Sequence, residues 1–431
     1  MDLGIKLIKL RPPFATIVYA AVGLFALIFG LVCVRSFFVD TLASRLDIQD
    51  PAAGAIVDQL VSSSPGDPKT HLLAAVYYQN TFDVADLDRS LAEYQKAADL
   101  DPSDYTLWLG VAQAEARIGE NDAAEAAFVK ASQLAPHYAS VQWAYGNFLV
   151  RRGRSDEGFA LIAKAASENP DLAGPAAVLV LQMTDGDVAT TRRLLGNDPG
   201  VNSALASTLS SQKRYSDALD AWFAIPLELR QDRYRQAGLY LQNAFLTDHQ
   251  IRAAAAITAD LTPDENSRPS VGKLIDGGFE NGVKLRNAGP FEWQISDGSD
   301  PQIGLSESQK HGGRYALSVA YSTAIQPGNR NISQLVAVEP GARYRVEIWY
   351  KSNIKGDAKF RWQLVGQAGA NVLAKTSDML PTETWTALSM EVTVPVDSDS
   401  LTLELAKTGC ASSVCPTSGT ILFDDFSLTK E

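Results

Sequence analysis

The chain has 431 residues, 46% hydrophobic and 20% charged, and a formal net charge of -12 at pH 7. These proportions exclude a disordered, collagen-like or coiled-coil chain, and the length predicts two or three domains. The negative charge argues against nucleic-acid binding, which needs a basic face to displace counterions. Because only 4 His and 3 Cys are present, a zinc cluster or a cysteine-stapled fold is nearly excluded.

The N-terminal region contains an uncharged apolar run at residues 14–34. Its 21 residues would form about 30 Å of helix, enough to cross the hydrocarbon core of a bilayer. Three basic residues precede it and acidic residues follow it, which favours a cytoplasmic N-terminus. The alternative is a cleaved signal peptide, whose apolar region is usually only about 7–15 residues. We therefore predict a cytoplasmic stub at 1–13, a transmembrane signal anchor at 14–36 and a linker with the first helices at 37–69.

Residues 70–262 are rich in Ala and Leu and show an internal period. Pro102, Pro136 and Pro170 follow one another at intervals of 34 residues. Small and aromatic residues recur at matching positions between them. This pattern resembles the tetratricopeptide repeat family, so we expect pairs of helices stacked into a solenoid. The resemblance implies a groove that binds a protein partner. Residues 40–270 carry 19 basic against 31 acidic side chains, which would favour a basic partner, unless the acidity serves only solvation.

The helical period stops at a polar linker, residues 263–270, and β-type patterning follows in residues 271–431. Seven short runs of β-branched and aromatic residues are separated by Gly, Pro, Asn and Asp, which predicts a two-sheet sandwich. The expected strands are 315–321, 332–338, 344–351, 360–365, 386–394, 401–406 and 420–428. The whole chain is therefore predicted to be multidomain: a transmembrane helix, an all-α solenoid and an all-β sandwich.

Three sequence stretches at 274–282, 311–317 and 421–428 occur in this order in the predicted sandwich. They resemble the jelly-roll carbohydrate-binding modules of the galactose-binding-like group. Such modules often hold a structural calcium ion, and the matching oxygen donors here are Glu280, Asp424 and Asp425. The alternative is that these acidic side chains cap loops.

Alternation within two expected strands predicts an outward polar face. Apolar residues occupy every second position in both strands and should face the core. The remaining side chains would then face outward together, and an indole with planar polar groups around it suits a sugar ring. The predicted sugar site consists of Trp349, Arg345, Glu347, Arg361 and Gln363. The alternative is a solvated sheet face, or Trp349 packed under a loop.

Cys410 and Cys415 lie in a short Ser-rich segment near the C-terminus. Their closeness predicts a local disulfide, which would require an oxidising compartment. A metal site would need two further ligands, and none is in evidence. The predicted disulfide and the predicted anchor orientation agree with each other.

No nucleophile elbow, phosphate loop or His-Glu-x-x-His pattern occurs, so we expect no enzyme. The preferred hypothesis is a scaffold held in the inner membrane, with its bulk in the periplasm. Its repeats would bind a protein partner and its sandwich a glycan, in cell-envelope or exopolysaccharide assembly. The rival hypothesis is a protein-assembly factor whose sandwich has no sugar ligand.

Overall fold

The computed structural model describes residues 14–45, 53–81, 83–324, 330–366, 371–409 and 415–431. The chain divides into two compact units, residues 1–172 and 173–431. The division falls inside the predicted helical array, at the end of its third regular repeat. Each unit is described separately below.

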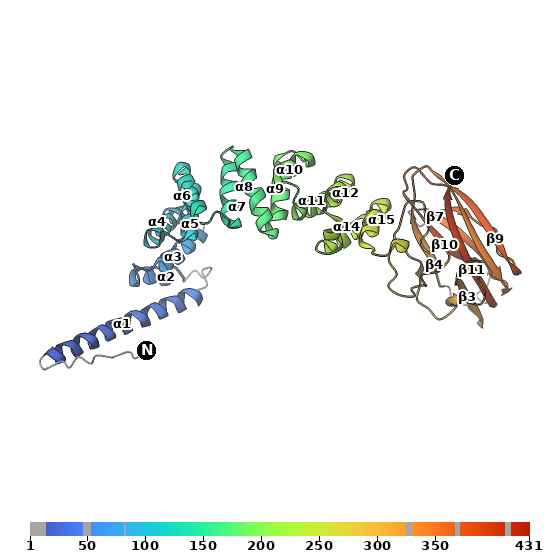
Figure 1. The fold of residues 1–431 in the computed structure, drawn as a ribbon, viewed down its shortest axis with the longest axis horizontal. Helices are drawn as coiled ribbons and strands as arrows, with labels where there is room; N and C mark the ends of the chain where they lie inside the picture. Colours follow the sequence, from blue (N-terminus) through green and yellow to red (C-terminus); the bar gives the residue numbers. More distant parts are fainter. Residues whose placement is uncertain (1–13, 46–52, 82, 325–329, 367–370, 410–414) are drawn as a thin grey trace, which may run out of the picture. The chain divides into compact units, whose positions relative to one another are not determined.

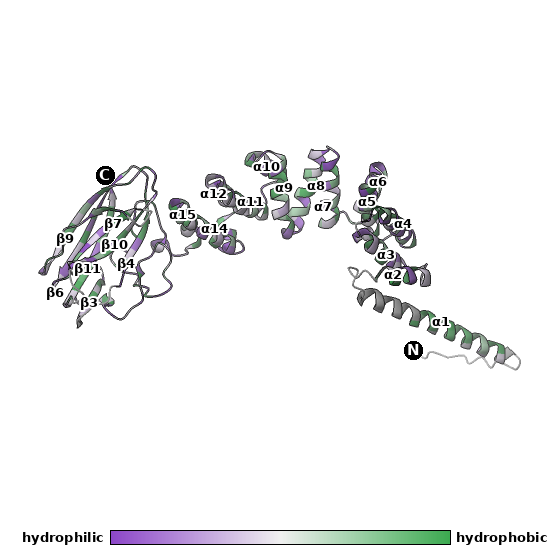
Figure 2. Cartoon of the chain, turned by 180° about the vertical axis from the view of Figure 1, so that it is seen from behind, coloured by the Kyte–Doolittle hydropathy of each residue, from purple (hydrophilic) through white to green (hydrophobic). Residues whose placement is uncertain are grey.

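The first helix of unit 1 is α1 (Phe14–Arg45), and its stretch Ala15–Val34 is long and apolar enough to cross a membrane. None of that stretch is buried against the rest of the protein, and Figure 2 shows the hydrophobic residues along this helix. Large apolar side chains such as Leu24, Phe25 and Leu31 are more than half exposed. An N-terminal helix of this kind is expected of a signal anchor or a signal sequence, because exposed apolar side chains are unfavourable in water.

The described part of unit 1 contains seven further α-helices, and the last six of them form three antiparallel pairs (Figure 1). The helix starts of the last two pairs repeat at the predicted spacing of 34 residues, from 105 to 139 and from 121 to 155. The small residues Ala97 and Ala124 and the aromatic Phe128 are buried within this array. The seven helices are α2 (Ala53–Ser63), α3 (Pro68–Asn80), α4 (Val84–Leu100), α5 (Tyr105–Ile118), α6 (Asn121–Leu134), α7 (Ala139–Arg151) and α8 (Ser155–Glu168).

Close helix packing explains the small residues of the repeat. A Cβ atom added to Gly146 on α7 would lie 2.8 Å from the carbonyl oxygen of Gly158 on α8. A Cβ added to Gly158 would lie 2.7 Å from the carbonyl oxygen of Gly146. Both positions therefore need glycine, because the two backbones touch where the helices cross. Gly110 on α5 meets the ring of Tyr94 on α4 in the same way.

One hydrogen bond recurs in three consecutive pairs. Trp108 donates its Nε1–H to the carbonyl of Pro102 at 3.0 Å, and Gln142 donates to the carbonyl of Pro136 at 2.7 Å. In the preceding pair, Nε2 of His71 lies 3.0 Å from the carbonyl of Pro65. In each case the donor is six residues after the proline, so the first helix of each of these three pairs is tied to the turn before it. The residue at this position differs among the three pairs, but each residue donates a hydrogen bond to the carbonyl of the proline.

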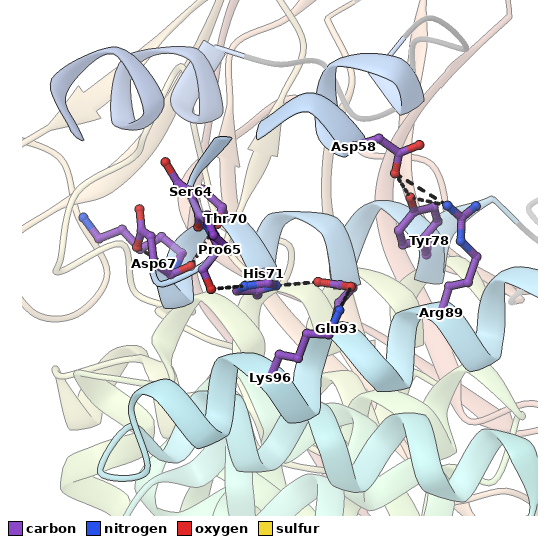
Figure 3. Close-up of polar contacts among 11 residues, drawn as sticks. Asp58, Ser64, Pro65, Asp67, Thr70, His71, Tyr78, Arg89, Glu93 and Lys96 are labelled. Carbon is purple, nitrogen blue, oxygen red and sulfur yellow. Dashed lines mark hydrogen bonds and ion pairs between the residues drawn. The ribbon is translucent and has the colours of Figure 1, made fainter. Parts of the chain in front are cut away.

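His71 also belongs to a buried ion-pair network between α3 and α4 (Figure 3). Its Nδ1 lies 2.5 Å from Oε2 of Glu93, and Lys96 Nζ lies 2.7 Å from Oε1 of the same carboxylate. Burial alone would raise the pKa of Glu93, but the hydrogen bonds from His71 and Lys96 outweigh it and hold that pKa below its ordinary value. The network fixes α4 to the turn between α2 and α3.

Unit 2 begins with the less regular helices. They include two helix pairs, at residues 199–223 and 235–261. Trp222 is fully buried, and a Cβ on Gly238 would lie 2.7 Å from its ring, so the same small-to-large packing continues. The helices are α9 (Ala173–Met183), α10 (Val188–Leu195), α11 (Pro199–Ser211), α12 (Tyr215–Phe223), α13 (Leu227–Gln231), α14 (Arg235–Thr247) and α15 (Ile251–Leu261).

The remainder of unit 2 is a sandwich of two antiparallel sheets. The five-stranded sheet has the order β1-β4-β10-β7-β8, and the six-stranded sheet has the order β2-β3-β11-β5-β9, with β6 pairing β11. The strands are β1 (Gln294–Ile295), β2 (Gln302–Ser306), β3 (Ala316–Ala324), β4 (Ile332–Ala337), β5 (Arg343–Ser352), β6 (Lys355–Gly356), β7 (Lys359–Gly366), β8 (Val372–Lys375), β9 (Thr382–Thr393), β10 (Ser400–Thr408) and β11 (Thr417–Lys430).

All seven predicted strands are present, as β3, β4, β5, β7, β9, β10 and β11. The core between the sheets is rich in aromatic side chains. Trp362 is fully buried and packs edge-on against Trp293, Phe423 and Phe426, with ring centroids 4.9–5.9 Å apart. The multidomain fold class predicted from the sequence is confirmed: one long apolar helix, an all-α region and an all-β sandwich.

Candidate functional site

The alternation predicted for the two strands of the sugar site is confirmed. On β5, Tyr344, Val346, Ile348 and Tyr350 are buried, whereas Arg345, Glu347 and Trp349 point away from the core. On β7, Phe360, Trp362 and Leu364 are buried, whereas Arg361 and Gln363 point away from it.

The prediction that these five outward residues share one face is wrong. β5 belongs to the six-stranded sheet and β7 to the five-stranded sheet, so their outward sides are opposite faces of the sandwich. Alternation of apolar and polar residues predicts which side chains of a strand point away from the core, but it does not predict which sheet the strand joins. Arg345, Glu347 and Trp349 therefore form one set, and Arg361 and Gln363 form another.

The second set lies on a polar sheet face. Gln363 donates from Nε2 to Oε1 of Glu404 on the neighbouring strand β10 at 2.6 Å. Arg361 lies 3.9 Å from Asp378. The outward positions of the described strands β4, β7 and β10 carry no aromatic side chain. This face therefore offers hydrogen-bonding groups without a platform for a sugar ring.

The first set lies on the outer face of the six-stranded sheet, where Trp349 also belongs to an aromatic cluster. We call this cluster the outer aromatic cluster; it consists of His311, Trp349 and Trp385. The imidazole of His311 stacks on the indole of Trp349, with ring centroids 4.0 Å apart and an interplanar angle of 13°. Trp385, on β9, lies 5.7 Å from His311 in a tilted arrangement. All three side chains keep part of their surface exposed.

A buried carboxylate holds His311 over the sheet. Asp424 pairs with Trp349 across β11 and β5, points to the same outer face, and is nevertheless fully buried. Its Oδ2 accepts the backbone N–H groups of His311 at 2.7 Å and Gly312 at 3.0 Å. Burial raises the pKa of the Asp424 carboxyl above its ordinary value, despite these hydrogen bonds. Asp424 thus anchors the loop that covers Trp349.

Two further acidic side chains hold the same loop. Asp425 has a left-handed backbone, φ +46°, at a bulge in β11, and its Oδ2 lies 2.6 Å from Nδ1 of His311. Glu280 accepts the backbone N–H of Arg314 at 2.8 and 3.0 Å. A Cβ added to Gly312 would lie 2.7 Å from Asp425 Oδ2, so this glycine is needed for the close approach.

The three residues predicted to hold calcium are therefore brought to one loop, but their oxygens are engaged by backbone N–H groups and by His311. Within the described part of the chain, no group of three or more His, Cys, Asp or Glu residues is arranged to hold a metal ion. The observed hydrogen bonds at Glu280, Asp424 and Asp425 are those of the alternative, in which these acids cap a loop. Structural calcium stays a prediction that these contacts do not favour.

The sequence analysis missed two members of the outer aromatic cluster. Trp385 precedes the predicted strand 386–394, whereas β9 begins four residues before the predicted start, at Thr382. Extending the alternation of that strand backwards would have placed Trp385 with Ala387 on the outward face. No sequence signal placed His311 on Trp349, because the contact depends on a loop fixed by the distant Asp424.

The predicted disulfide involves Cys410, which lies outside the described residues. Cys415 is buried, 4.0 Å from Oγ1 of Thr417. The Cys410–Cys415 pair stays a prediction. The cytoplasmic stub at 1–13 also lies outside the described residues.

Comparisons with known proteins agree with this architecture. Residues 272–416 match the model of a carbohydrate-binding domain family. No curated protein sequence matches the chain. One similar solved structure is TmCBM61 in complex with beta-1,4-galactotriose, which is 20% identical over 36% of this chain and 96% of that one, with a TM-score of 0.27.

Two solved structures resemble the helical region. TTC0263, a tetratricopeptide repeat protein of Thermus thermophilus, is 25% identical over 27% of this chain and 65% of that one, with a TM-score of 0.25. PilF of Pseudomonas aeruginosa is 18% identical over 45% of this chain and 90% of that one, with a TM-score of 0.27.

The chain therefore combines two kinds of domain. Its helical region is of the tetratricopeptide type, on the evidence of the 34-residue spacing of its helix pairs. Its C-terminal sandwich is of the carbohydrate-binding type. Domains of these two kinds are non-catalytic.

Proposed function

We propose that this chain is a membrane-anchored, extracytoplasmic scaffold that binds glycan through its C-terminal sandwich and a protein partner through its repeats. We place it in exopolysaccharide or cell-envelope assembly and assign it no enzymatic activity. The observation that carries the proposal is the outer aromatic cluster on a sandwich that matches a carbohydrate-binding family.

The chemistry of the cluster suits a sugar. A pyranose ring presents C–H groups on its faces and hydroxyl groups on its edges, so it stacks on flat aromatic rings and bonds to polar groups beside them. Trp385 and His311 supply the flat surfaces, and Trp349 lies beneath His311. Arg345 and Glu347 extend along β5 on the same outward side. Arg361 and Gln363 are no longer part of this proposed site.

The membrane assignment is supported by α1. Its exposed apolar surface over Ala15–Val34 fits a lipid environment, and the basic residues before it favour a cytoplasmic N-terminus. The rest of the chain would then lie in the periplasm.

Glycan binding is tested with the full chain in detergent on a glycan array, followed by titration of the best ligand. Trp385→Ala should weaken binding about tenfold to hundredfold, since one stacked ring contributes on the order of 1–3 kcal/mol. Gln363→Ala, on the opposite face, is the control and should leave the affinity unchanged. If Gln363→Ala abolishes binding and Trp385→Ala has no effect, the site lies on the five-stranded sheet. If no glycan binds, the sandwich is a structural or protein-binding module, as the rival hypothesis holds.

A further inference from the structure

Five of the described helices begin after an aspartate that caps them. In each, the carboxylate accepts the backbone N–H of the second helical residue at 2.8–3.0 Å. This bond satisfies one of the N–H groups that the first turn of a helix leaves without a partner inside the helix. The aspartates are Asp67 before α3, Asp83 before α4, Asp104 before α5, Asp187 before α10 and Asp198 before α11.

The last helix, α15, receives the same bond from the sandwich. Gln250 occupies its N-cap position and makes no side-chain hydrogen bond to the start of the helix. Instead, Oδ2 of Asp399 accepts the backbone N–H of Arg252, the second residue of α15, at 2.8 Å. Asp399 lies 147 residues further along the chain, in the turn between β9 and β10. Without Asp399, α15 would begin like the second helices α6, α8 and α12, which have no side-chain cap.

A second contact between α15 and the sandwich lies beside this cap. α15 contacts β4, and Glu339 lies in the turn that follows β4. The hydrogen bond from Lys430 holds the pKa of Glu339 below its ordinary value, and the positive charge of Arg252 lowers it further. The contact is therefore basic on the helix and acidic on the sandwich, which is attractive. We call this contact, made by Arg252, Glu339 and Asp399, the α15–sandwich joint.

The connection between α15 and the sandwich is bonded to both of them. Residues 263–270, predicted as a linker, contain Arg268, whose Nε donates to the carbonyl of Thr262 at the end of α15 at 2.9 Å. At the other end, the backbone N–H of Gly272 donates to the carbonyl of Ala337 on β4 at 2.8 Å. The joint is therefore closed by a short connection that is itself held in place.

We propose that the sandwich is the C-terminal cap of the helical array, and that it unfolds together with the last helix pair, α14 and α15, as one cooperative unit. A stack of repeats needs a cap at each end, because its terminal repeat has no neighbour on one side. Here Asp399 supplies the missing N-cap, and the turns after β4 and β9 supply the contact surface. The division of the chain agrees, since α9–α15 and the sandwich fall in the same compact unit.

This inference goes beyond the proposed function, because it needs no sugar ligand. It also has a consequence for a sandwich that does bind glycan. A ligand that binds only the folded unit stabilises everything that unfolds with that unit, so bound glycan would also stabilise α14 and α15. This consequence rests on the proposed function, whereas the α15–sandwich joint does not.

The first experiment tests the cap by hydrogen exchange of the full chain in detergent. Asp399→Ala should accelerate exchange of the hydrogen-bonded amides near the start of α15 about fivefold, because an N-cap is lost. Asp397→Ala is the matched control: it removes the same charge from the same turn and should leave this exchange unchanged. Adding Gln250→Asp to the Asp399→Ala chain should restore slow exchange, because α15 would regain a cap of the kind that α3, α4 and α5 carry.

The second experiment tests the shared unfolding on the same samples. Trp362→Ala destabilises the core of the sandwich, so the slowest amides of α14 and α15 should exchange faster by a factor similar to that of β7 and β10. The amides of α7 and α8 in unit 1 should keep their rates. Gly158→Ala is the reverse control: it should accelerate exchange in α7 and α8 and leave α14 and α15 unchanged. Trp362→Phe gives the same comparison at lower cost if Trp362→Ala does not fold.

Three results would overturn the inference. Unchanged exchange of α14 and α15 in the Trp362 variants would show that the helices and the sandwich unfold separately. Equal effects of Asp399→Ala and Asp397→Ala would show that the charge of the turn matters and the cap does not. Failure of Gln250→Asp to restore slow exchange would show that Asp399 acts on its own turn. None of these measurements needs a glycan, so failure of the proposed function would leave the joint unaffected.

Discussion

The two tryptophans at 349 and 362 give the sharpest test of the sandwich. Trp362 is fully buried among three aromatic rings, so Trp362→Ala should leave a cavity and lower the free energy of unfolding by about 3–5 kcal/mol. Trp349 is partly exposed, and among the described residues it stacks on one ring, that of His311. Trp349→Ala should lose that contact, worth about 0.5–1.5 kcal/mol, and some buried area.

Hydrogen exchange of β7 and β10 in the intact chain measures this difference, because their slowest amides exchange by unfolding of the sandwich. Trp362→Ala should accelerate that exchange by about a hundredfold or more, and Trp349→Ala by about tenfold or less. Trp362→Phe is the control: it keeps an aromatic ring and removes an indole N–H that has no hydrogen-bond partner among the described residues, so it should cost less than Trp362→Ala. If Trp349→Ala accelerates exchange as much as Trp362→Ala, the outward assignment of Trp349 is refuted.

Three further predictions concern other parts of the chain. The pKa of Glu93 lies below its ordinary 4.5, so its pairing with His71 and Lys96 stabilises α3 and α4 fully above about pH 4.5. This stabilisation is lost as the pH falls through the lower pKa of the folded state. Hydrogen exchange of these helices should become faster over that pH range, and Glu93→Gln should make the pH dependence smaller. Gly158→Ala should destabilise the pair α7–α8 by more than about 1 kcal/mol, read from the denaturation midpoint, whereas Gly174→Ala, which has open space, should not. A reporter active only outside the cytoplasm, fused after residue 431, should be active; activity of a cytoplasmic reporter instead would contradict the topology.

The sequence predicted elements well where one pattern recurs. The 34-residue spacing of prolines located the helix pairs, and runs of β-branched and aromatic residues located seven strands. The strands β1, β2, β6 and β8 were not predicted, because they are two to five residues long and too short to stand out as runs.

The candidate site was predicted only in part, for a physical reason. Alternation along β5 gave Arg345, Glu347 and Trp349 correctly as outward residues. It could not pair β5 with β11 and β9, since sheet order depends on contacts between residues far apart in the chain. For the same reason it grouped Arg361 with the wrong face and left His311 out.

Because His311 stacks on Trp349, a ligand that binds the same face of the indole competes with the imidazole of His311. A ligand that stacks on the same face of Trp349 must first displace the imidazole, which Asp424 and Asp425 hold in place. If the open arrangement lies about 1.4 kcal/mol above the closed one, only about a tenth of the molecules is ready to bind, and the apparent affinity falls about tenfold. Glycan affinity at this face would then be set partly by carboxylates that never touch the sugar. For a ligand of this kind, loosening the loop would strengthen binding, whereas a sugar that stacks on His311 itself needs the loop in its closed position.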